Sequence, residues 1–376
     1  MASPSAPAPA KPALSGDDED DGWTVRSRFL VDPAAVLDHN AWDDVEWQPE
    51  QLERAQNIVK QQHEAARNQS SNDVDAGAWG GASDAPATHA AAQRSAQNRD
   101  LRDSSCDGAG RWDTFYLQHD DGFFKDRQWL FKEFPLLQIA MEETTLANAT
   151  AASSGNGGAA KAVEILEVGC GAGNTIYPLL SSCTALKVHA CDFAPTAVDV
   201  VKAHPMYNET GRVHAFVCDI AADVGESGCG LLNGSPEEEH ELLGLQGIQP
   251  GSLDFVITIF VLSAIDPHRF PLVMRRLASV LKPGGCLLFR DYGLYDLTQL
   301  RFKPGRVLGY PNQYVRGDGT KVYYFNKEEL KGLAQETMVP LNIGSGGISE
   351  AVDSSHGSDC RLIVRECDED RRLLVN

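Results

Sequence analysis

The residues from Glu167 to Asn174, with the sequence EVGCGAGN, are suited to holding a ligand against backbone amides. Three glycines alternate with small residues, and glycine lets N–H groups approach a ligand closely at the start of a helix. The dinucleotide-binding pattern G-x-G-x-x-G is not satisfied, because Asn174 stands where its last glycine would be. An ordinary tight turn between a strand and a helix is the alternative interpretation.

Two acidic residues at later strand ends could complete a nucleoside site. Asp192 ends the second strand-like run, where a carboxylate can accept hydrogen bonds from both ribose hydroxyls. Asp219 ends the third, where it could receive an adenine amino group while Ile220 covers the ring. Either acid alone could instead cap a helix. Residues 167–173 resemble the E-x-G-x-G-x-G loop of class I S-adenosylmethionine (SAM) methyltransferases, and the two acids strengthen the prediction of a SAM pocket.

The sequence from Lys161 onward predicts the sheet that would bring these residues together. Strand-like runs cover 162–168, 186–193, 212–220, 253–262 and 286–292, with helix-like stretches such as 194–204 and 270–281 between them. Several runs are apolar on both faces, as in strands buried between two helix layers. The alternation predicts an α/β fold with a Rossmann-like, doubly wound parallel sheet. We expect runs at 321–325 and 360–365 to complete that sheet.

Composition and charge exclude several classes of protein. Of 376 residues, 42% are hydrophobic and 23% are charged, which allows a packed core. The sequence has no run of about 18 apolar residues, so we expect no integral membrane protein and no membrane partner. A net charge of −20 argues against a general nucleic-acid coat, and we expect no DNA partner. Nine cysteines without a C-x-x-C pair predict reduced thiols, with neither a metal site nor a disulfide scaffold.

Cations and aromatic side chains nevertheless gather in two places. In the block 123–134, Phe124, Lys125 and Arg127 suit contacts with unpaired bases and phosphates. The aromatic residues that we expect in the core there are Trp129, Phe131 and Phe134. The stretch 301–321, called the basic strip below, carries Arg301, Lys303, Arg306, Arg316 and Lys321 against one acid, Asp318. It predicts an RNA track, with a solvated loop as the alternative.

Composition also divides the chain. Residues 1–22 are rich in Ala, Pro and Ser and then acidic, which predicts a disordered leader. Residues 23–67 form a predicted N-terminal extension with a helix from Pro49, and 68–110 a flexible linker. The catalytic domain is expected at 111–376, with an N-terminal cap at 111–143, a second linker at 144–161 and an insertion at about 221–250. The N-terminus resembles no secretory or transit signal, so we expect the cytoplasm, with the nucleus as the alternative.

Two sequence blocks point to one family. The first joins RWDTFY (111–116) to GFFKDRQWLFKEF (122–134), and the second joins IFVLSAI (259–265), LKPGG (281–285) and RDYG (290–293). With FKPGR, YVRGDGT and VYYF between 302 and 325, they closely resemble the tRNA N3-methylcytidine methyltransferases. The segment FLVDPAAVLDHNAWDDVEW (29–47) resembles the N-terminal extension of the branch linked to threonine and some arginine tRNAs.

This resemblance implies a reaction and a set of contacts. SAM would be the cofactor, S-adenosylhomocysteine the product, and the cytidine at anticodon-loop position 32 of a tRNA the target. Trp112 and Tyr116 would close over SAM, and Arg290, Asp291 and Tyr292 would face the base. The remaining expected cofactor contacts are Glu167, Gly169, Gly171, Gly173, Asn174, Asp192, Phe193, Asp219, Ile220 and Ile259. The expected RNA contacts are Phe124, Lys125, Arg127, Arg301, Lys303, Arg306 and Arg316.

The implied chemistry asks mainly for positioning. Cytosine N3 carries a lone pair and no proton at neutral pH, so no nucleophilic side chain, metal or obligatory general base is required. The enzyme must unpair the base and align N3 with the methyl group. The product base is cationic, and Asp291 is the predicted stabilising carboxylate. Arg290 could hold the base carbonyl or a phosphate, and Tyr292 could stack.

Two other functions remain open from the sequence. One is a SAM-dependent methyltransferase that acts on a protein or a small molecule. The other is a binding module that keeps the SAM fold without catalysis. The anticodon stem-loop is the expected partner, and an accessory tRNA-binding protein could contribute to the choice of tRNA.

Overall fold

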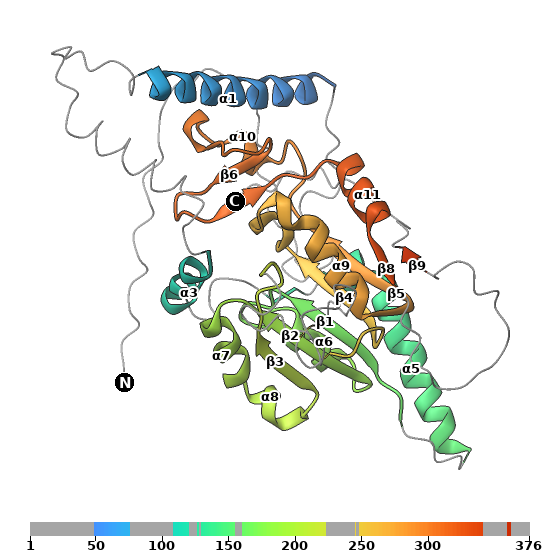
Figure 1. Cartoon of the computed structure of the whole chain (residues 1–376). Coiled ribbons are helices and arrows are strands. Elements are labelled where there is room, and N and C mark those ends of the chain that lie inside the picture. The colour runs from blue at the N-terminus through green and yellow to red at the C-terminus, as the bar shows by residue number, and fades with distance from the viewer. Residues whose placement is uncertain are drawn as a thin grey trace, which may run out of the picture.

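The computed structural model describes residues 49–75, 108–119, 126–127, 129–154, 160–222, 245, 248–340 and 359–361. A five-stranded parallel sheet lies at its centre, with helices packed on both faces (Figure 1). The strand order is β3-β2-β1-β4-β5. The strands are β1 (Val163–Val168), β2 (Leu186–Asp192), β3 (Val213–Val217), β4 (Leu253–Ile259) and β5 (Leu281–Arg290). The expected α/β, doubly wound parallel fold is confirmed.

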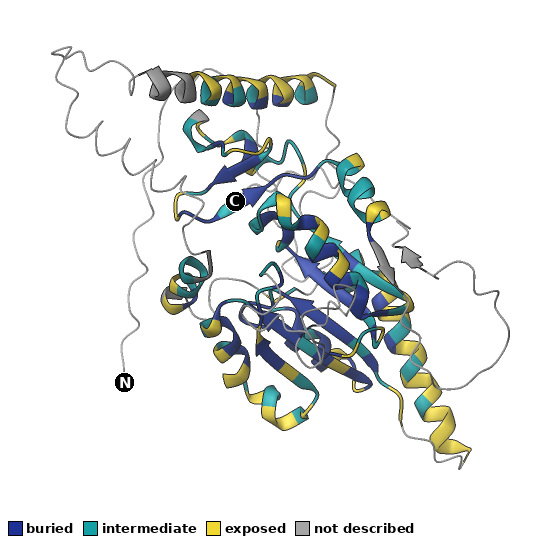
Figure 2. Cartoon of the chain, in the orientation of Figure 1, coloured by how far each residue is buried: buried dark blue, intermediate teal, exposed yellow. Residues whose placement is uncertain are grey.

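The strands are apolar on both sides because each face of the sheet carries its own core. On one face Ile165 packs in a cluster with residues of α5 (Pro135–Ser153), α6 (Ile176–Ser182) and α7 (Pro195–Ala203). On the other face Leu166 packs in a cluster with residues of α9 (Phe270–Val280) and α11 (Lys327–Glu336). Figure 2 shows the central strands as largely buried and the far end of α5 as exposed. Successive residues of a strand therefore enter different cores.

The order in which strands are added to the sheet reverses at β1. β1 pairs with β2 on one side and with β4 on the other. β3 continues outward from β2, and β5 continues outward from β4. The carboxyl ends of β1 and β4 thus flank the point where the strand order reverses, and such a point is where open α/β sheets bind ligands.

The two C-terminal strand predictions need correction. The runs at 321–325 and 360–365 do not join the central sheet among the described residues. β7 (Lys321–Tyr323) pairs with β6 (Gln313–Val315), and β9 (Asp359–Arg361) pairs with β8 (Met338–Pro340), each pair antiparallel. The β6–β7 turn is closed locally, since Arg316 N donates to Thr320 O at 2.8 Å and Gly319 has a φ of +85°. A small separate core of Val307, Tyr314, Val322 and Tyr324 holds this hairpin.

Helix α1 (Pro49–Asp75) covers that small core (Figure 1). Gln62 is 3% exposed, and its amide donates to Gln299 O at 3.2 Å and to Phe302 O at 2.8 Å. Tyr314 Oη donates in turn to Gln62 Oε1 at 2.9 Å. A segment far to the N-terminal side of the sheet is therefore part of the C-terminal subdomain, which contains α10 (Leu297–Leu300) and the short helix η4 (Pro304–Arg306).

Both predicted linkers begin with helix instead. α1 continues through residues 68–75, and α5 continues through 144–153. Neither stretch contains glycine or proline, and the second is rich in alanine, so no helix-breaking residue ends the helix where the composition changes. α3 (Gly108–His119) similarly begins inside the end of the first predicted linker.

Several predicted segments lie outside the described residues. They include the leader 1–22, the family-like run 29–47, the linker residues 76–107 and insertion residues 223–244. The domain boundaries at 67, 110 and 143 stay predictions. Within the described part of the chain, no helix is both long and apolar enough to cross a membrane.

Candidate functional site

The glycine turn after β1 is packed so tightly that only glycine fits. Gly169, Gly171 and Gly173 have φ values of +64°, +51° and +87°. A Cβ at Gly169 would lie 2.5 Å from Val261 Cγ2, and one at Gly171 would lie 2.7 Å from the Tyr116 hydroxyl. The left-handed backbone excludes most other residues for a second, independent reason. The turn is thus a backbone cradle that opens into α6.

Asp192 ties the end of β2 to this cradle. Its Oδ2 accepts from Gly171 N and its Oδ1 from Ala194 N, both at 3.0 Å. The residue is 5% exposed, and burial raises its pKa to about 6 although hydrogen bonds from the backbone N–H groups of Ala194, Gly171 and Phe193 lower it. An ionised carboxylate has about four lone-pair sites, so these bonds do not use all of them. The group can therefore still accept hydrogen bonds from ligand hydroxyls.

Glu167 supplies a second buried carboxylate below the turn. Its Oε1 lies 3.2 Å from Arg127 Nη1, which also donates to Thr175 Oγ1 at 2.9 Å. Its Oε2 is buried and has no hydrogen-bond partner within the described structure. Burial raises the pKa of Glu167 to about 7, with Arg127 opposing. An unsatisfied buried acceptor beside a glycine cradle fits a ligand that carries a donor, such as the amino group of SAM.

The third strand end is arranged less tightly. Asp219 lies two residues beyond β3, and its Oδ1 accepts from Ala221 N at 2.8 Å. Ile220 is 5% exposed and Ile259, the last residue of β4, is 2% exposed. The carbonyl of Ile220 accepts from Arg276 Nη1 at 2.7 Å. Arg276, 2% exposed on α9, was not predicted as a site residue, because a single arginine in a helix is normally solvated.

Helix α3 closes the cofactor side. Tyr116 and, less deeply, Trp112, Phe115 and Phe193 pack together with Ala194 and Ala197 at the start of α7. Asp113 Oδ1 accepts from Thr196 N at 2.9 Å, which fastens α3 to the N-terminus of α7. The Tyr116 hydroxyl lies against Gly171, and burial raises its pKa well above the usual range. The helix thus brings Trp112 and Tyr116 to the glycine turn.

The expected catalytic residues lie at the end of β5 and point to opposite faces. Arg290 Nη1 lies 2.8 Å from Glu133 Oε2, and its guanidinium carbon lies 4.7 Å from the centroid of the Trp129 ring. Asp291 instead accepts from Ser263 N and Tyr292 N, both at 2.9 Å. Burial raises the pKa of Asp291 to about 6, so the carboxylate is largely ionised at neutral pH.

The described residues of segment 126–134 (126–127 and 129–134), which we call the strap, join both halves of the site. One end carries the Arg127–Glu167 ion pair, and the other carries Glu133–Arg290 with the charges reversed. Arg127 N also donates to Asn174 O at 2.9 Å. The expected core residues of the strap, Trp129, Phe131 and Phe134, do pack against the core, which confirms that prediction.

The strap also changes the interpretation of Arg127. We expected an RNA contact, but its side chain is 17% exposed and its guanidinium is bound to Glu167 and Thr175. A cation with these partners supports the glycine turn. Phe124 and Lys125 lie outside the described residues.

The basic strip divides into residues with different surroundings. Arg301 and Lys303 are exposed. Lys321 Nζ pairs with Asp266 at 3.0 Å, and Arg306 Nη1 donates to Arg316 O at 3.4 Å. Arg316 turns toward the catalytic edge, with its guanidinium carbon 5.2 Å from the centroid of the Tyr292 ring. The strip thus runs from exposed cations to the end of β5.

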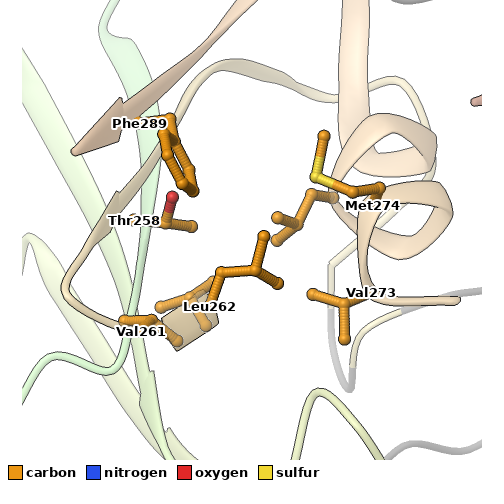
Figure 3. Close-up of a pocket in the computed structure, with 8 residues that line it drawn as sticks. Thr258, Val261, Leu262, Val273, Met274 and Phe289 are labelled. Carbon is orange, nitrogen blue, oxygen red and sulfur yellow. The ribbon is translucent and has the colours of Figure 1, made fainter. Parts of the chain in front are cut away.

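A small apolar cavity lies beside the site and carries none of the expected ligand contacts. Figure 3 shows Thr258, Val261, Leu262, Met274 and Phe289 around it. An apolar cavity of this kind normally stays empty of water. Its relevance is that Val261 also packs against Gly169, so the cavity wall supports the glycine turn from behind.

Two residues at the site, Glu133 and Phe260, could not be identified from the sequence. Glu133 stood in the strap as an ordinary acid, and only the fold shows its ion pair with Arg290. Phe260 stood in a strand-like apolar run, yet its side chain is 36% exposed with a φ of +59°. An exposed large apolar residue and a positive φ are both properties of tertiary structure.

Comparisons with known proteins agree on the class of enzyme. A methyltransferase-domain family model matches residues 166–287. The tRNA N(3)-cytidine methyltransferase METTL2 of Danio rerio is 39% identical over 326 residues, which cover 82% of this chain and 77% of that protein. The METTL2 protein of Xenopus tropicalis is 38% identical and covers 82% of both chains.

Two further likenesses are more partial. The tRNA(Thr) (cytosine(32)-N(3))-methyltransferase of Saccharomyces cerevisiae is 36% identical over 81% of this chain and 39% of its own length. A Haemonchus contortus phosphoethanolamine N-methyltransferase 2 structure, in complex with SAM, is 17% identical over 65% of this chain and 46% of that one. Its TM-score of 0.33 is too low to carry an argument.

The cradle at 169–173 and the unsatisfied Glu167 oxygen fit SAM. The relatives match well beyond the catalytic domain model, since they cover 82% of the chain, including sequence on both sides of residues 166–287. The chain therefore belongs to the family of tRNA N(3)-cytidine methyltransferases, which are SAM-dependent enzymes.

Proposed function

We propose that this protein methylates N3 of the cytidine at anticodon-loop position 32 of threonine tRNAs, arginine tRNAs or both. The observation that carries the proposal is the junction of two sites. Phe260 N donates to Arg290 O at 2.9 Å, while the next residue, Val261, packs against Gly169. The glycine turn and the edge Arg290–Tyr292 are thereby fixed beside each other. The name of the yeast relative, which specifies tRNA(Thr) and cytosine 32, supports the choice of target.

The glycine turn and its neighbours would hold the cofactor. SAM supplies an electrophilic methyl group when it is bound. Asp192 would accept from the ribose hydroxyls and Asp219 from the adenine amino group, with Ile220 and Ile259 against the ring. Trp112 and Tyr116 would cover the cofactor from α3. The turn residues that would surround its amino-acid part are Glu167, Gly169, Gly171, Gly173 and Asn174, with Phe193 next to Asp192.

The edge of β5 would act on the base by position and charge. N3 of cytosine attacks with its own lone pair, so the protein needs no general base for that step. Asp291 is held in place by the backbone N–H groups of Ser263 and Tyr292. Its carboxylate would stabilise the positive charge that develops on the base. Arg290 would hold the base carbonyl or a phosphate, and Tyr292 would stack.

The RNA would approach along the basic strip. Arg301 and Lys303 are exposed and form no ion pair with the residues that the structure describes, while Arg306 and Arg316 continue toward Tyr292. Phosphate contacts of this kind position an RNA without reading its sequence. Phe124 and Lys125 would extend the track, and Arg127 would support Glu167 instead. The choice of tRNA, an accessory tRNA-binding protein and cytoplasmic residence are further parts of this proposal.

The test uses purified full-length protein, methyl-labelled SAM and tRNA from cells that lack the activity. Nucleoside mass spectrometry after digestion should find the label in 3-methylcytidine, and sequencing should place it at position 32. The Asp291→Ala variant serves as the inactive control. Label in another nucleoside, or in protein in place of RNA, would contradict the proposed substrate while leaving the family assignment intact.

A further inference from the structure

Phe260 has an unusual backbone at the carboxyl end of β4. Its φ of +59° lies in the left-handed region, which is rare and costly for a bulky residue that is not glycine. The bond from Phe260 N to Arg290 O, at 2.9 Å, fixes this geometry. Strained residues of this kind persist where the surrounding structure determines them, and they gather at binding sites.

Packing does not explain the strain. The Phe260 side chain is 36% exposed, whereas its neighbours Ile259 and Leu262 are each 2% exposed. If the backbone turned only to fill the core, the aromatic ring would be the group that it buries. The turn instead leaves the largest side chain of this stretch partly exposed and buries the smaller ones.

The position of the ring is next to the expected reaction. β4 lies between β1 and β5, where the strand order reverses. Val261, the following residue, packs against Gly169 of the glycine turn. Phe260 is therefore flanked by the cofactor turn on one side and by the Arg290–Tyr292 edge on the other.

Phe260 also packs against a second aromatic ring, that of Tyr292. Its ring centroid lies 4.7 Å from that of Tyr292, with the planes inclined by 37°. The Arg316 guanidinium carbon lies 5.2 Å from the Tyr292 centroid. Proteins that bind unpaired nucleotides stack bases on aromatic rings in this manner, often with arginine nearby.

We propose that Phe260 is a substrate-binding residue whose ring stacks on the target pyrimidine after the base leaves the RNA stack. This inference rests on the proposed function and adds a residue that the sequence did not indicate. The strain at Phe260 presents an aromatic face beside the cofactor turn before the RNA arrives. A base that must be unpaired loses stacking with its neighbours, and Phe260 would replace part of that lost interaction.

Two substitutions at this position separate stacking from bulk. Phe260→Tyr keeps an aromatic face, and Phe260→Leu keeps an apolar side chain on the same strained backbone. We expect Phe260→Leu to slow single-turnover methylation of tRNA roughly 5- to 150-fold, the usual range for loss of one base–aromatic stack. Phe260→Tyr should stay within about threefold of the wild type, by the same reasoning. The affinity for SAM, measured by calorimetry, should be unchanged in both, and equal rates for the two variants would overturn the proposal.

Phe260→Gly tests the strain itself. Glycine adopts positive φ without steric strain, which offsets part of the stability lost with the ring, so this variant should still fold while losing activity to the same degree as Phe260→Leu. Full activity in Phe260→Gly would also overturn the stacking role.

A fluorescent RNA probe can report stacking on Phe260 without requiring methyl transfer. The probe is an anticodon stem-loop RNA with pyrrolocytidine at position 32, titrated with protein and S-adenosylhomocysteine. Wild type and Phe260→Tyr should change its fluorescence alike, and Phe260→Leu should not. If the wild type methylates no cytidine but this contrast holds, the proposed reaction fails and the stacking site stands. An identical response from all three proteins would refute stacking, whatever the reaction.

Discussion

At the scale of single residues, Asp192 has two roles, one in holding the glycine turn and one in the proposed binding of SAM, and a substitution should affect both. It accepts from the N–H groups of Gly171 and Ala194, and we propose that it also accepts from the ribose. Asp192→Ala would leave two buried donors unpaired, which costs about 1–3 kcal/mol each at most. We expect weaker SAM binding by calorimetry together with a lower free energy of unfolding. Asp199→Ala, at an exposed acid on α7, is the matched control and should change neither quantity.

Asp291 makes the reaction dependent on pH in a defined direction. Burial raises its pKa to about 6, and the ionised form is the one that would stabilise a cationic base. The rate of methyl transfer should therefore fall as the pH drops through about 6, because the carboxylate takes up a proton. Asp291→Ala should keep SAM binding, lose most turnover and lose this pH dependence. A wild-type profile that is flat between pH 5 and pH 8 would contradict the assignment.

The same shift has an opposite consequence for folding. A carboxyl whose pKa is raised on folding binds its proton more tightly in the native state. Asp192, Asp291 and Glu167, with pKa values of about 6, 6 and 7, therefore favour the folded state less as the pH rises through these values. At neutral pH Asp192 and Asp291 are mostly ionised and therefore carry this cost, whereas Glu167 is about half protonated.

At the scale of elements, the strap makes Glu133 a positioning residue for Arg290. The two side chains are 20% and 23% exposed, and their atoms lie 2.8 Å apart. Glu133→Gln should weaken that ion pair and let the guanidinium move. A shift of about 1 Å at a reacting centre can cost up to about 100-fold in rate. We expect a lower kcat with an unchanged dissociation constant for SAM.

The control for this prediction is Glu143→Gln, at an exposed acid on α5. It should leave kcat and thermal stability as they are. A fall in SAM affinity in Glu133→Gln, without a change in kcat, would show that the strap acts on the glycine turn alone. Arg127→Lys should produce that second pattern, since Arg127 contacts Glu167 and Thr175.

The elements also show what sequence can and cannot predict. The apolar runs gave β1 and β2 within one residue at each end, because buried parallel strands are apolar throughout. The same rule failed at 321–325, where an antiparallel hairpin with its own small core is just as apolar. The acids and glycines of the site could be predicted because they follow the ends of apolar strands. Glu133 and Phe260 could not, because the ion pair of Glu133 with Arg290 and the left-handed backbone of Phe260 depend on tertiary packing.

At the scale of the whole molecule, two distant parts of the chain form one subdomain. Gln62 on α1 bonds to the backbone at Gln299 and Phe302 and to the Tyr314 hydroxyl. Phe302 and Tyr314 lie within the basic strip and Gln299 lies just before it, so α1 packs against the strip. Arg316 of the strip in turn contacts Tyr292. We propose that a substrate held on the strip would thereby reach the end of β5.

The chain is negatively charged overall but the basic strip is positive, and this contrast predicts the direction in which RNA affinity changes with salt concentration. The chain carries a net charge of −20, so its long-range field repels RNA, yet the exposed Arg301 and Lys303 would contact phosphates directly. Direct contacts release counterions, and affinity should then fall as salt rises, with a logarithmic slope of roughly −0.7 to −0.9 for each phosphate neutralised. Arg301→Ala combined with Lys303→Ala should flatten the slope by about 1.4–1.8, as measured by filter binding to tRNA from 50 to 300 mM salt. Affinity that rises with salt would mean that the global repulsion dominates, and an unchanged slope in the double variant would place the RNA on another surface.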